Sequence, residues 1–170
     1  MAKFRKPMQR KQGLKILMYG VDGSGKSWTA LTFPRLAIVD TESKLGVYEN
    51  NPEKNQNILG ISDTVNYYDV IDLMEEVVAN PKTYSTFVID SETNLYDSMQ
   101  VAMMEVEESR AKKKGKSADD ATVSMRGWGK VKLNNARLKN LRAQMSANGI
   151  TMISIAHKKD IFEEINGKQG

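Results

Sequence analysis

The chain has 170 residues, enough for one domain with a buried core, and its formal net charge is +4 at pH 7. It contains no cysteine, which excludes disulfides and thiolate metal sites. Its longest apolar run, residues 150–156, is too short to cross a bilayer, and no apolar segment of a secretory signal follows the basic N-terminus. We therefore expect a cytoplasmic protein with no membrane partner.

Charge is strongly segregated along the chain. Residues 1–21 carry +6, residues 110–142 carry +9, and the remainder carries −11. Two basic blocks on an acidic body predict contact with a polyanion, although a solvated tail and a solvated loop are the alternative. We expect a basic tail over 1–13, a core over 14–170, and a mobile basic loop at about 112–124.

Strand and helix patterns alternate. Strands are expected at residues 14–19, 36–40, 58–61, 86–90 and 150–156, and helices at 26–33, 66–79, 93–111 and 127–147. This alternation predicts an α/β three-layer sandwich with a mostly parallel central sheet. In the third helix Leu95, Met99, Ala102 and Val106 form an expected buried stripe. Asn166-Gly167 signals a hairpin turn, but three residues follow, so we expect a truncated hairpin without a returning strand.

Residues 20–27 read GVDGSGKS, a complete G-x-x-x-x-G-K-[ST] phosphate-binding loop. Its glycines allow the backbone amides to point inward at a phosphate. A predicted strand precedes the loop and a predicted helix follows it, which is the context that the motif requires. We expect Lys26 to reach the β- and γ-phosphates and Ser27 to hold Mg²⁺. The predicted nucleotide-binding residues are Asp22, Gly23, Ser24, Gly25, Lys26, Ser27 and Trp28.

Two further predicted strands end in acids. Residues 86–90 are an apolar run that ends in Asp90, the Walker B pattern, so Asp90 is expected to join Ser27 around Mg²⁺. The alternative is that Asp90 or Ser91 caps the next helix. Residues 36–40 lead into Glu42. Because ligands bind at the carboxyl ends of the strands in open α/β sheets, Glu42 could act as general base on a water, with a solvated acid as the alternative.

The last predicted strand ends in His157, the only histidine. We expect His157 to hydrogen-bond the γ-phosphate, although a lone histidine is often structural. Lys158 and Lys159 follow, and they could stabilise transition-state charge or contact nucleic acid. Trp128 lies between two glycines at the start of the last long helix, where it either stacks on a base or packs over the helix end. The predicted catalytic residues are Lys26, Glu42 and His157.

The order of these motifs resembles the RecA-like ATPase core. In that family the Glu after the second core strand is the catalytic base, which matches Glu42, and the Walker B Asp matches Asp90. The sensor at the end of the last strand is commonly Gln, and here that position is His157. Residues 33–42 and 155–158 are similar to small phage-encoded AAA-family and single-strand-annealing recombination ATPases. The resemblance covers residues 14–160.

The resemblance implies ATP and Mg²⁺ as ligands, DNA-stimulated ATP hydrolysis and binding of single-stranded DNA. It implies homo-oligomers, as rings or filaments, with ATP near subunit interfaces, a single-strand DNA-binding protein as a further partner, and the host cytoplasm as the compartment. The family binds DNA through loops after its fourth and fifth core strands, which correspond here to about 110–126 and to the segment after His157. The DNA-binding residues expected on this basis are Lys112, Lys113, Lys114, Lys116, Arg126, Lys158 and Lys159.

Other P-loop classes fit less well. A GTPase would carry Asn-Lys-x-Asp where residues 157–160 read His-Lys-Lys-Asp, and its Walker B strand would continue with a Gly that is missing after Asp90. A small-molecule kinase would need an Arg-rich lid, whereas the 110–126 segment is dominated by lysine. A nucleotide-gated DNA-binding switch with little turnover is the third alternative.

Overall fold

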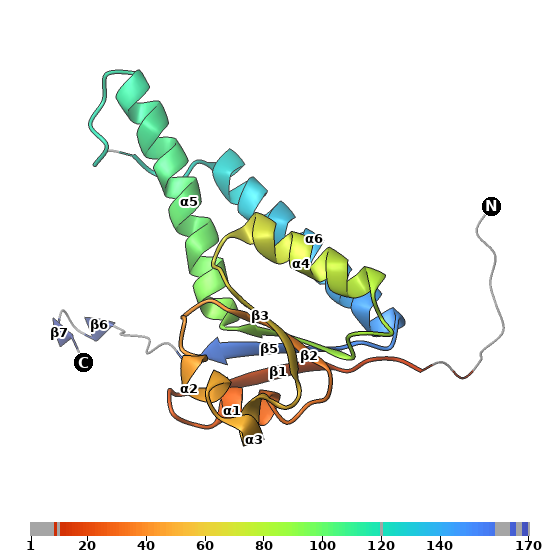
Figure 1. Ribbon diagram of the computed structural model, residues 1–170. Coiled ribbons are helices and arrows are strands. Elements are labelled where there is room, and N and C mark those ends of the chain that lie inside the picture. Colours follow the sequence, from red (N-terminus) through yellow and green to blue (C-terminus); the bar gives the residue numbers. More distant parts are fainter. Residues whose placement is uncertain (1–8, 10, 120, 159–163, 166–167, 170) are drawn as a thin grey trace, which may run out of the picture.

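The computed structural model describes residues 9, 11–119, 121–158, 164–165 and 168–169. Its centre is one sheet of five parallel strands in the order β1-β5-β4-β2-β3 (Figure 1). The strands are β1 (Lys15–Gly20), β2 (Leu36–Asp40), β3 (Ile58–Asp63), β4 (Thr86–Asp90) and β5 (Thr151–His157). Since all five run the same way, their carboxyl ends meet at one edge.

Helices cover both faces of the sheet and make the predicted three-layer α/β fold (Figure 1). One face carries the short helices α1 (Lys26–Ala30), α2 (Gly46–Glu49) and α3 (Pro52–Asn55). The other face carries α4 (Tyr67–Ala79), α5 (Glu92–Lys113) and α6 (Met125–Ala147). Within the described part of the chain, no helix is both long enough and apolar enough to cross a membrane.

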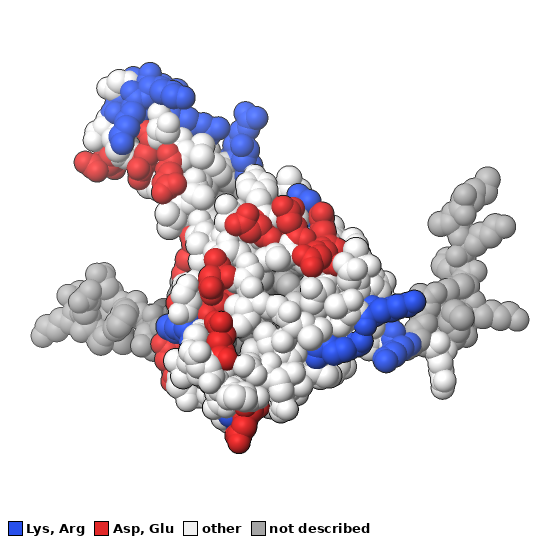
Figure 2. Space-filling model, in the orientation of Figure 1, with Lys and Arg blue, Asp and Glu red and all other residues white. Residues whose placement is uncertain are grey.

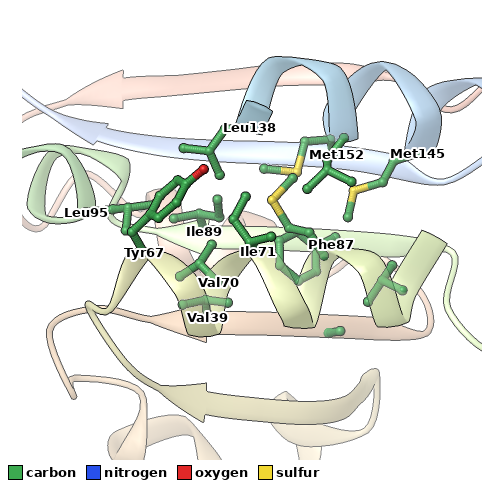
Figure 3. Packing of buried hydrophobic residues seen from close by; sticks show 14 of the residues in the cluster. Val39, Tyr67, Val70, Ile71, Phe87, Ile89, Leu95, Leu138, Met145 and Met152 are labelled. Carbon is green, nitrogen blue, oxygen red and sulfur yellow. The ribbon is translucent and has the colours of Figure 1, made fainter. Parts of the chain in front are cut away.

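The core consists of two apolar clusters, one on each face of the sheet. On the α4–α6 side, Val39, Phe87 and Ile89 of the sheet pack against residues such as Leu138 (Figure 3). On the other side, Ile38, Val88 and Ile153 pack against α1 and Leu45. Neighbouring residues of β2 and β4 therefore face opposite layers, which is why both strands are apolar along their whole length.

Several predicted boundaries differ from the structure. Helix α1 ends at Ala30 rather than at residue 33, and the helices α2 and α3 were not predicted. Helix α5 continues to Lys113, which shortens the predicted loop at its start. The predicted hairpin is present as β6 (Glu164–Ile165) and β7 (Lys168–Gln169), which pair antiparallel, so the expectation of no returning strand is wrong. The turn at 166–167 lies outside the described residues.

The far end of α5 and the start of α6 project from the body as a helical arm (Figure 1). We use "the arm" for residues 103–134. The predicted stripe is correct for Leu95 and Met99 but wrong for Ala102 and Val106, which are exposed. Met103 is buried instead, because beyond Met99 the helix packs against α6 rather than against the sheet. The apolar face of α5 therefore turns as the helix leaves the body.

Candidate functional site

A pocket of about 300 Å³ lies at the carboxyl ends of the strands. The loop of residues 22–27 and the following Trp28 form one wall. The ends of β2, β4 and β5 contribute Asp40, Glu42, Lys44, Asp90 and His157. Every predicted nucleotide-binding, metal-binding and catalytic residue lines this pocket, so the sheet topology brings together residues that are up to 135 positions apart in the chain.

The phosphate-binding loop has the backbone that its glycines allow. Gly23 and Gly25 adopt φ of 74° and 80°, a left-handed conformation that other residues rarely take. Helix α1 begins directly after Gly25. The ammonium of Lys26 lies in the loop and donates to the carbonyls of Gly20 and Val21 at 3.0 and 2.8 Å. The loop thus places a cation beside left-handed glycines and the start of a helix, which are features of a phosphate site.

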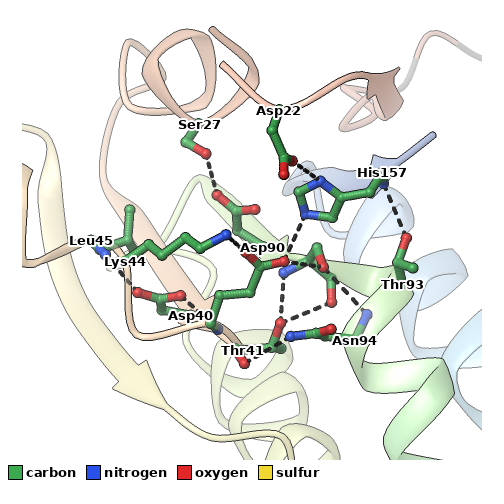
Figure 4. A network of polar contacts seen from close by, with 12 residues as sticks. Asp22, Ser27, Asp40, Thr41, Lys44, Leu45, Asp90, Thr93, Asn94 and His157 are labelled. Carbon is green, nitrogen blue, oxygen red and sulfur yellow. Dashed lines mark hydrogen bonds and ion pairs between the residues drawn. The ribbon is translucent and has the colours of Figure 1, made fainter. Parts of the chain in front are cut away.

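Ser27 and Asp90 meet across the floor of the pocket (Figure 4). The hydroxyl of Ser27 donates to Asp90 Oδ2 at 2.5 Å. Burial raises the pKa of Asp90, and the hydrogen bond from Ser27 opposes that rise. A hydroxyl and a carboxylate are oxygen donors of the kind that Mg²⁺ takes together with substrate phosphates, so this pair fits the ion. Among the described residues, no cluster of three or more acidic, histidine or cysteine side chains forms an all-protein metal site.

Glu42 has three polar partners in the pocket, which come from different parts of the chain. Its Oε1 accepts from Ser91 Oγ at 2.9 Å and lies 2.7 Å from His157 Nε2, while Oε2 forms an ion pair with Lys44. Burial alone would raise the pKa of Glu42. The hydrogen bonds from Lys44 and Ser91 and the charge of His157 outweigh burial and hold that pKa below its ordinary value. Glu42 is therefore ionised at neutral pH, as a base must be.

His157 connects the phosphate-binding loop to Glu42. Its Nδ1 lies 2.6 Å from Asp22 Oδ1, and its Nε2 approaches Glu42 without forming a well-aligned hydrogen bond. The strand register explains this position, since β5 pairs with β1 so that His157 lies opposite Gly20. The sequence predicted that His157 would lie at the phosphates, but it gave no indication of the two carboxylate partners.

The start of α5 joins this network. Ser91 caps α5 by accepting from Asn94 N at 3.3 Å and also donates to Glu42. Thr93 Oγ1 accepts from the backbone of His157 at 3.1 Å, and Thr41 Oγ1 accepts from the backbone of Ser91 at 2.7 Å. The cap offered as the alternative for the Walker B region is therefore present at Ser91, beside an Asp90 that still faces Ser27.

An aromatic pair borders the mouth of the pocket. Trp28 and Tyr48 pack edge to face with their ring centroids 6.1 Å apart, and the ammonium of Lys54 lies 3.2 Å from the centre of the Trp28 ring. Trp28 and Tyr48 both line the pocket. Sequence reasoning missed Tyr48 because the short helix α2 was not predicted. The signal that could have indicated Tyr48 was its position, six residues after Glu42 and so close to the end of a strand.

A larger groove of about 830 Å³ lies elsewhere, between β1 and the helices α5 and α6. Its floor is mainly apolar, with Leu17, Met99 and Leu138, and Arg142 pairs with Glu92 at its side at 2.6 Å. It contains neither the phosphate-binding loop nor the acids Glu42 and Asp90. Size alone would favour this groove, but the converging charged groups place the candidate site in the smaller pocket.

The predicted DNA-binding residues are divided between two places. Lys112 and Lys113 end α5, Lys114 and Lys116 follow it, and Arg126 lies in the first turn of α6. Figure 2 shows this basic group at the tip of the arm. Lys158 instead follows β5 beside the start of α5, where its backbone N–H donates to Gly20 O. Lys159 lies outside the described residues.

A comparison with models of protein families assigns the chain to a family. A family model, AAA_24, described as an AAA domain, matches residues 12–169. The chain belongs to the AAA_24 family. A comparison with curated proteins gives no match. The AAA_24 chain therefore carries an AAA-family P-loop domain, which indicates nucleotide binding and hydrolysis in general, and its five-stranded parallel sheet agrees with that assignment.

Proposed function

We propose that this AAA_24 protein is a Mg²⁺-dependent ATPase that uses Glu42 as its base and couples hydrolysis to binding of single-stranded DNA, in recombination or annealing of the phage type. The observation that carries the ATPase proposal is the position of Glu42. An ionised carboxylate lies in the same pocket as the phosphate-binding loop, 2.7 Å from a histidine that reaches that loop through Asp22. A binding-only site would not need a base held in this way.

Each side chain then has a distinct task. The loop amides and Lys26 hold the phosphates, and Ser27 and Asp90 hold Mg²⁺. When bound, this ion neutralises charge on the phosphate oxygens. Glu42 orients a water and takes its proton as the water oxygen bonds to the terminal phosphorus. The bond from that phosphorus to the bridging oxygen breaks, which leaves ADP and inorganic phosphate. His157 lies between Glu42 and the loop residue Asp22, and its charge helps to keep Glu42 ionised.

The aromatic pair is suited to the base of the nucleotide. Trp28 directly follows the Mg²⁺ ligand Ser27, and Tyr48 packs against it at the mouth of the pocket. Aromatic rings beside a phosphate site offer a flat apolar surface on which a purine can stack. We therefore assign the base to this wall, with the triphosphate extending from it toward Glu42.

The arm is the proposed DNA-binding region. Exposed lysines lie together at its tip (Figure 2). Lysine suits contact with the phosphates of a nucleic acid because it is a mobile point charge. Trp128 in the first turn of α6 is 39% exposed and could stack on an unpaired base. Subunit assembly into rings or filaments and a single-strand DNA-binding protein as partner remain part of this proposal.

Within the described residues, the arm does not form the lid that the kinase alternative needs. A lid must close over the phosphates, but the arm projects from the face of the sheet opposite to α1 and the phosphate-binding loop (Figure 1). The arginine at the end of α5, Arg110, is paired with Glu107 at 3.0 Å. The arm therefore fits a role in binding a partner rather than in covering the donor phosphates.

The test is ATP turnover by the wild-type chain and by Glu42→Gln, each with and without single-stranded DNA. We expect Glu42→Gln to bind ATP as the wild type does but to lose turnover by roughly 10²–10⁴-fold. We also expect DNA to stimulate only the wild type. Phosphoryl transfer to an added nucleoside would support the kinase instead. Undiminished turnover by Glu42→Gln would remove the assignment of Glu42 as the base. Wild-type turnover that is the same with and without DNA would remove the coupling of hydrolysis to DNA binding.

A further inference from the structure

Lys44 is a second cation in the pocket that sequence reasoning did not single out. Among the described pocket-lining residues, Lys26 and Lys44 are the lysines, and they share the space with Asp22, Glu42 and Asp90. Lys26 donates to the loop carbonyls, whereas the contact that the structure gives for the Lys44 ammonium is its ion pair with Glu42. The hydrogen bond that Lys44 donates to Glu42, together with the charges of Glu42, Asp22 and Asp90, raises the pKa of Lys44, so it is a cation.

The backbone that presents Lys44 is fixed on both sides. The carboxylate of Asp40 accepts from the N–H of Glu42 at 3.0 Å and from the N–H of Leu45 at 2.7 Å. Between them Ser43 adopts a left-handed φ of 52°, and Leu45 is buried in the core. The Lys44 side chain is 70% exposed. A rigid turn therefore holds a mobile ammonium over the pocket.

The two oxygens of Glu42 have partners of different kinds. Oε1 accepts a hydrogen bond from Ser91, the residue that caps α5, and lies 2.7 Å from His157 Nε2 at the end of β5. Oε2 is held by Lys44 alone among the described contacts. Because the Lys44 side chain is 70% exposed, water or another anion can replace its contact with Oε2, so Oε2 is the oxygen that is released more easily. A base whose second oxygen remains paired with an ammonium cannot take a proton through that oxygen.

We propose that Lys44 exchanges its partner when a nucleoside triphosphate binds: its ammonium leaves Glu42 Oε2 and pairs with the terminal phosphate. This inference rests on the proposed ATPase function. A terminal phosphate carries more negative charge than a carboxylate and forms strong charge-assisted hydrogen bonds. Once Lys44 moves, Oε2 is free to take the proton of the attacking water, and the ammonium stabilises charge on the transferred group. A diphosphate does not reach Lys44 and leaves the base paired.

The proposal makes Lys44 a catalytic residue that distinguishes triphosphate from diphosphate. The experiment compares Lys44→Met, Lys44→Arg and the wild type. Affinities for the β,γ-imido analogue of ATP and for ADP are measured with Mg²⁺, and kcat is measured with ATP. Lys82→Met is the matched control, since Lys82 is exposed at the opposite edge of the sheet and its substitution removes the same charge.

We expect Lys44→Met to lose about tenfold or more of its preference for the ATP analogue over ADP, and about 10²-fold in kcat. Lys44→Arg should restore most of both, and Lys82→Met should match the wild type. An unchanged preference in Lys44→Met, or a higher kcat, would overturn the proposal. The proposed function fails separately, if Glu42→Gln hydrolyses ATP at the wild-type rate. If Glu42→Gln is inactive but Lys44→Met keeps the wild-type kcat and nucleotide preference, only the role of Lys44 is removed.

Discussion

The pocket and the arm are built on opposite principles. In the pocket, the carboxylates of Asp40, Glu42 and Asp90 are largely buried, and each has a defined hydrogen-bond partner. At the arm tip the charges are exposed and stand close together in the sequence. Packed and hydrogen-bonded side chains can hold a productive geometry to within about 0.5 Å, whereas the exposed charges of the arm supply an electrostatic field with little fixed geometry. This difference suits one region to chemistry and the other to a flexible, charged partner.

The largest effect should come from the pocket. Lys26→Ala removes the cation that the loop carbonyls hold among the phosphate-binding amides. We expect ATP hydrolysis to fall by about 10³-fold or more, because the ground state and the transition state both lose this charge. Turnover and equilibrium ATP binding measure the effect. Comparable thermal unfolding of the two proteins is the control. A Lys26→Ala variant that still hydrolyses ATP would contradict the assignment of the chemistry to the pocket.

An intermediate effect should come from the arm, and it should depend on salt. Replacing Lys112, Lys113, Lys114 and Lys116 together with Ala should weaken binding of single-stranded DNA. If each contacts one phosphate, the slope of log affinity against log salt should fall by roughly 3, at about 0.7 per contact. ATP hydrolysis without DNA should remain at the wild-type rate. An unchanged slope would favour the alternative interpretation, in which this basic segment is a solvated loop without DNA contacts.

The smallest effect should be on stability and should separate two glycines of the arm. Nothing lies within 4 Å of a side chain added at Gly129, so Gly129→Ala should stabilise α6 by about 0.5–1 kcal/mol. At Gly127 an added Cβ meets Val123 at 3.0 Å and Met103 at 3.2 Å, where α5 and α6 cross. Gly127→Val should therefore destabilise the arm. Denaturant unfolding checks both, and equal effects of the two changes would mean that the helices do not pack here.

Much of the fold could be predicted from the sequence. The five strands of the sheet are apolar runs bounded by polar segments, and every predicted strand boundary lies within two residues of the observed one. The phosphate-binding loop and the acids Glu42 and Asp90 could be identified because local patterns mark strand ends. The two short helices could not, since four residues give no periodicity. Only a local signal, Asn51 capping Glu53 with Pro52 at the first position, indicates one of them.

The polar network of the site could not be predicted. The contact of His157 with Asp22 depends on β5 pairing with β1 in one register, and the sequence does not contain the strand order. The link between Ser91 and Glu42 needs β2 and β4 to be neighbours. Lys44 was missed for a different reason: a lysine next to acids is common on surfaces, and only the turn held by Asp40 shows that it faces the pocket.

Helix α5 is one uninterrupted rod whose first residue follows Ser91 at the base and whose last residues are the basic tip. At 1.5 Å per residue its 22 residues span about 33 Å. A tilt of about 5° at Ser91 would sweep the tip through roughly 3 Å, about the spacing of successive bases on a stacked strand. If α5 moves as one rigid body, a small rearrangement at its first residues would therefore be enlarged at the tip of the arm.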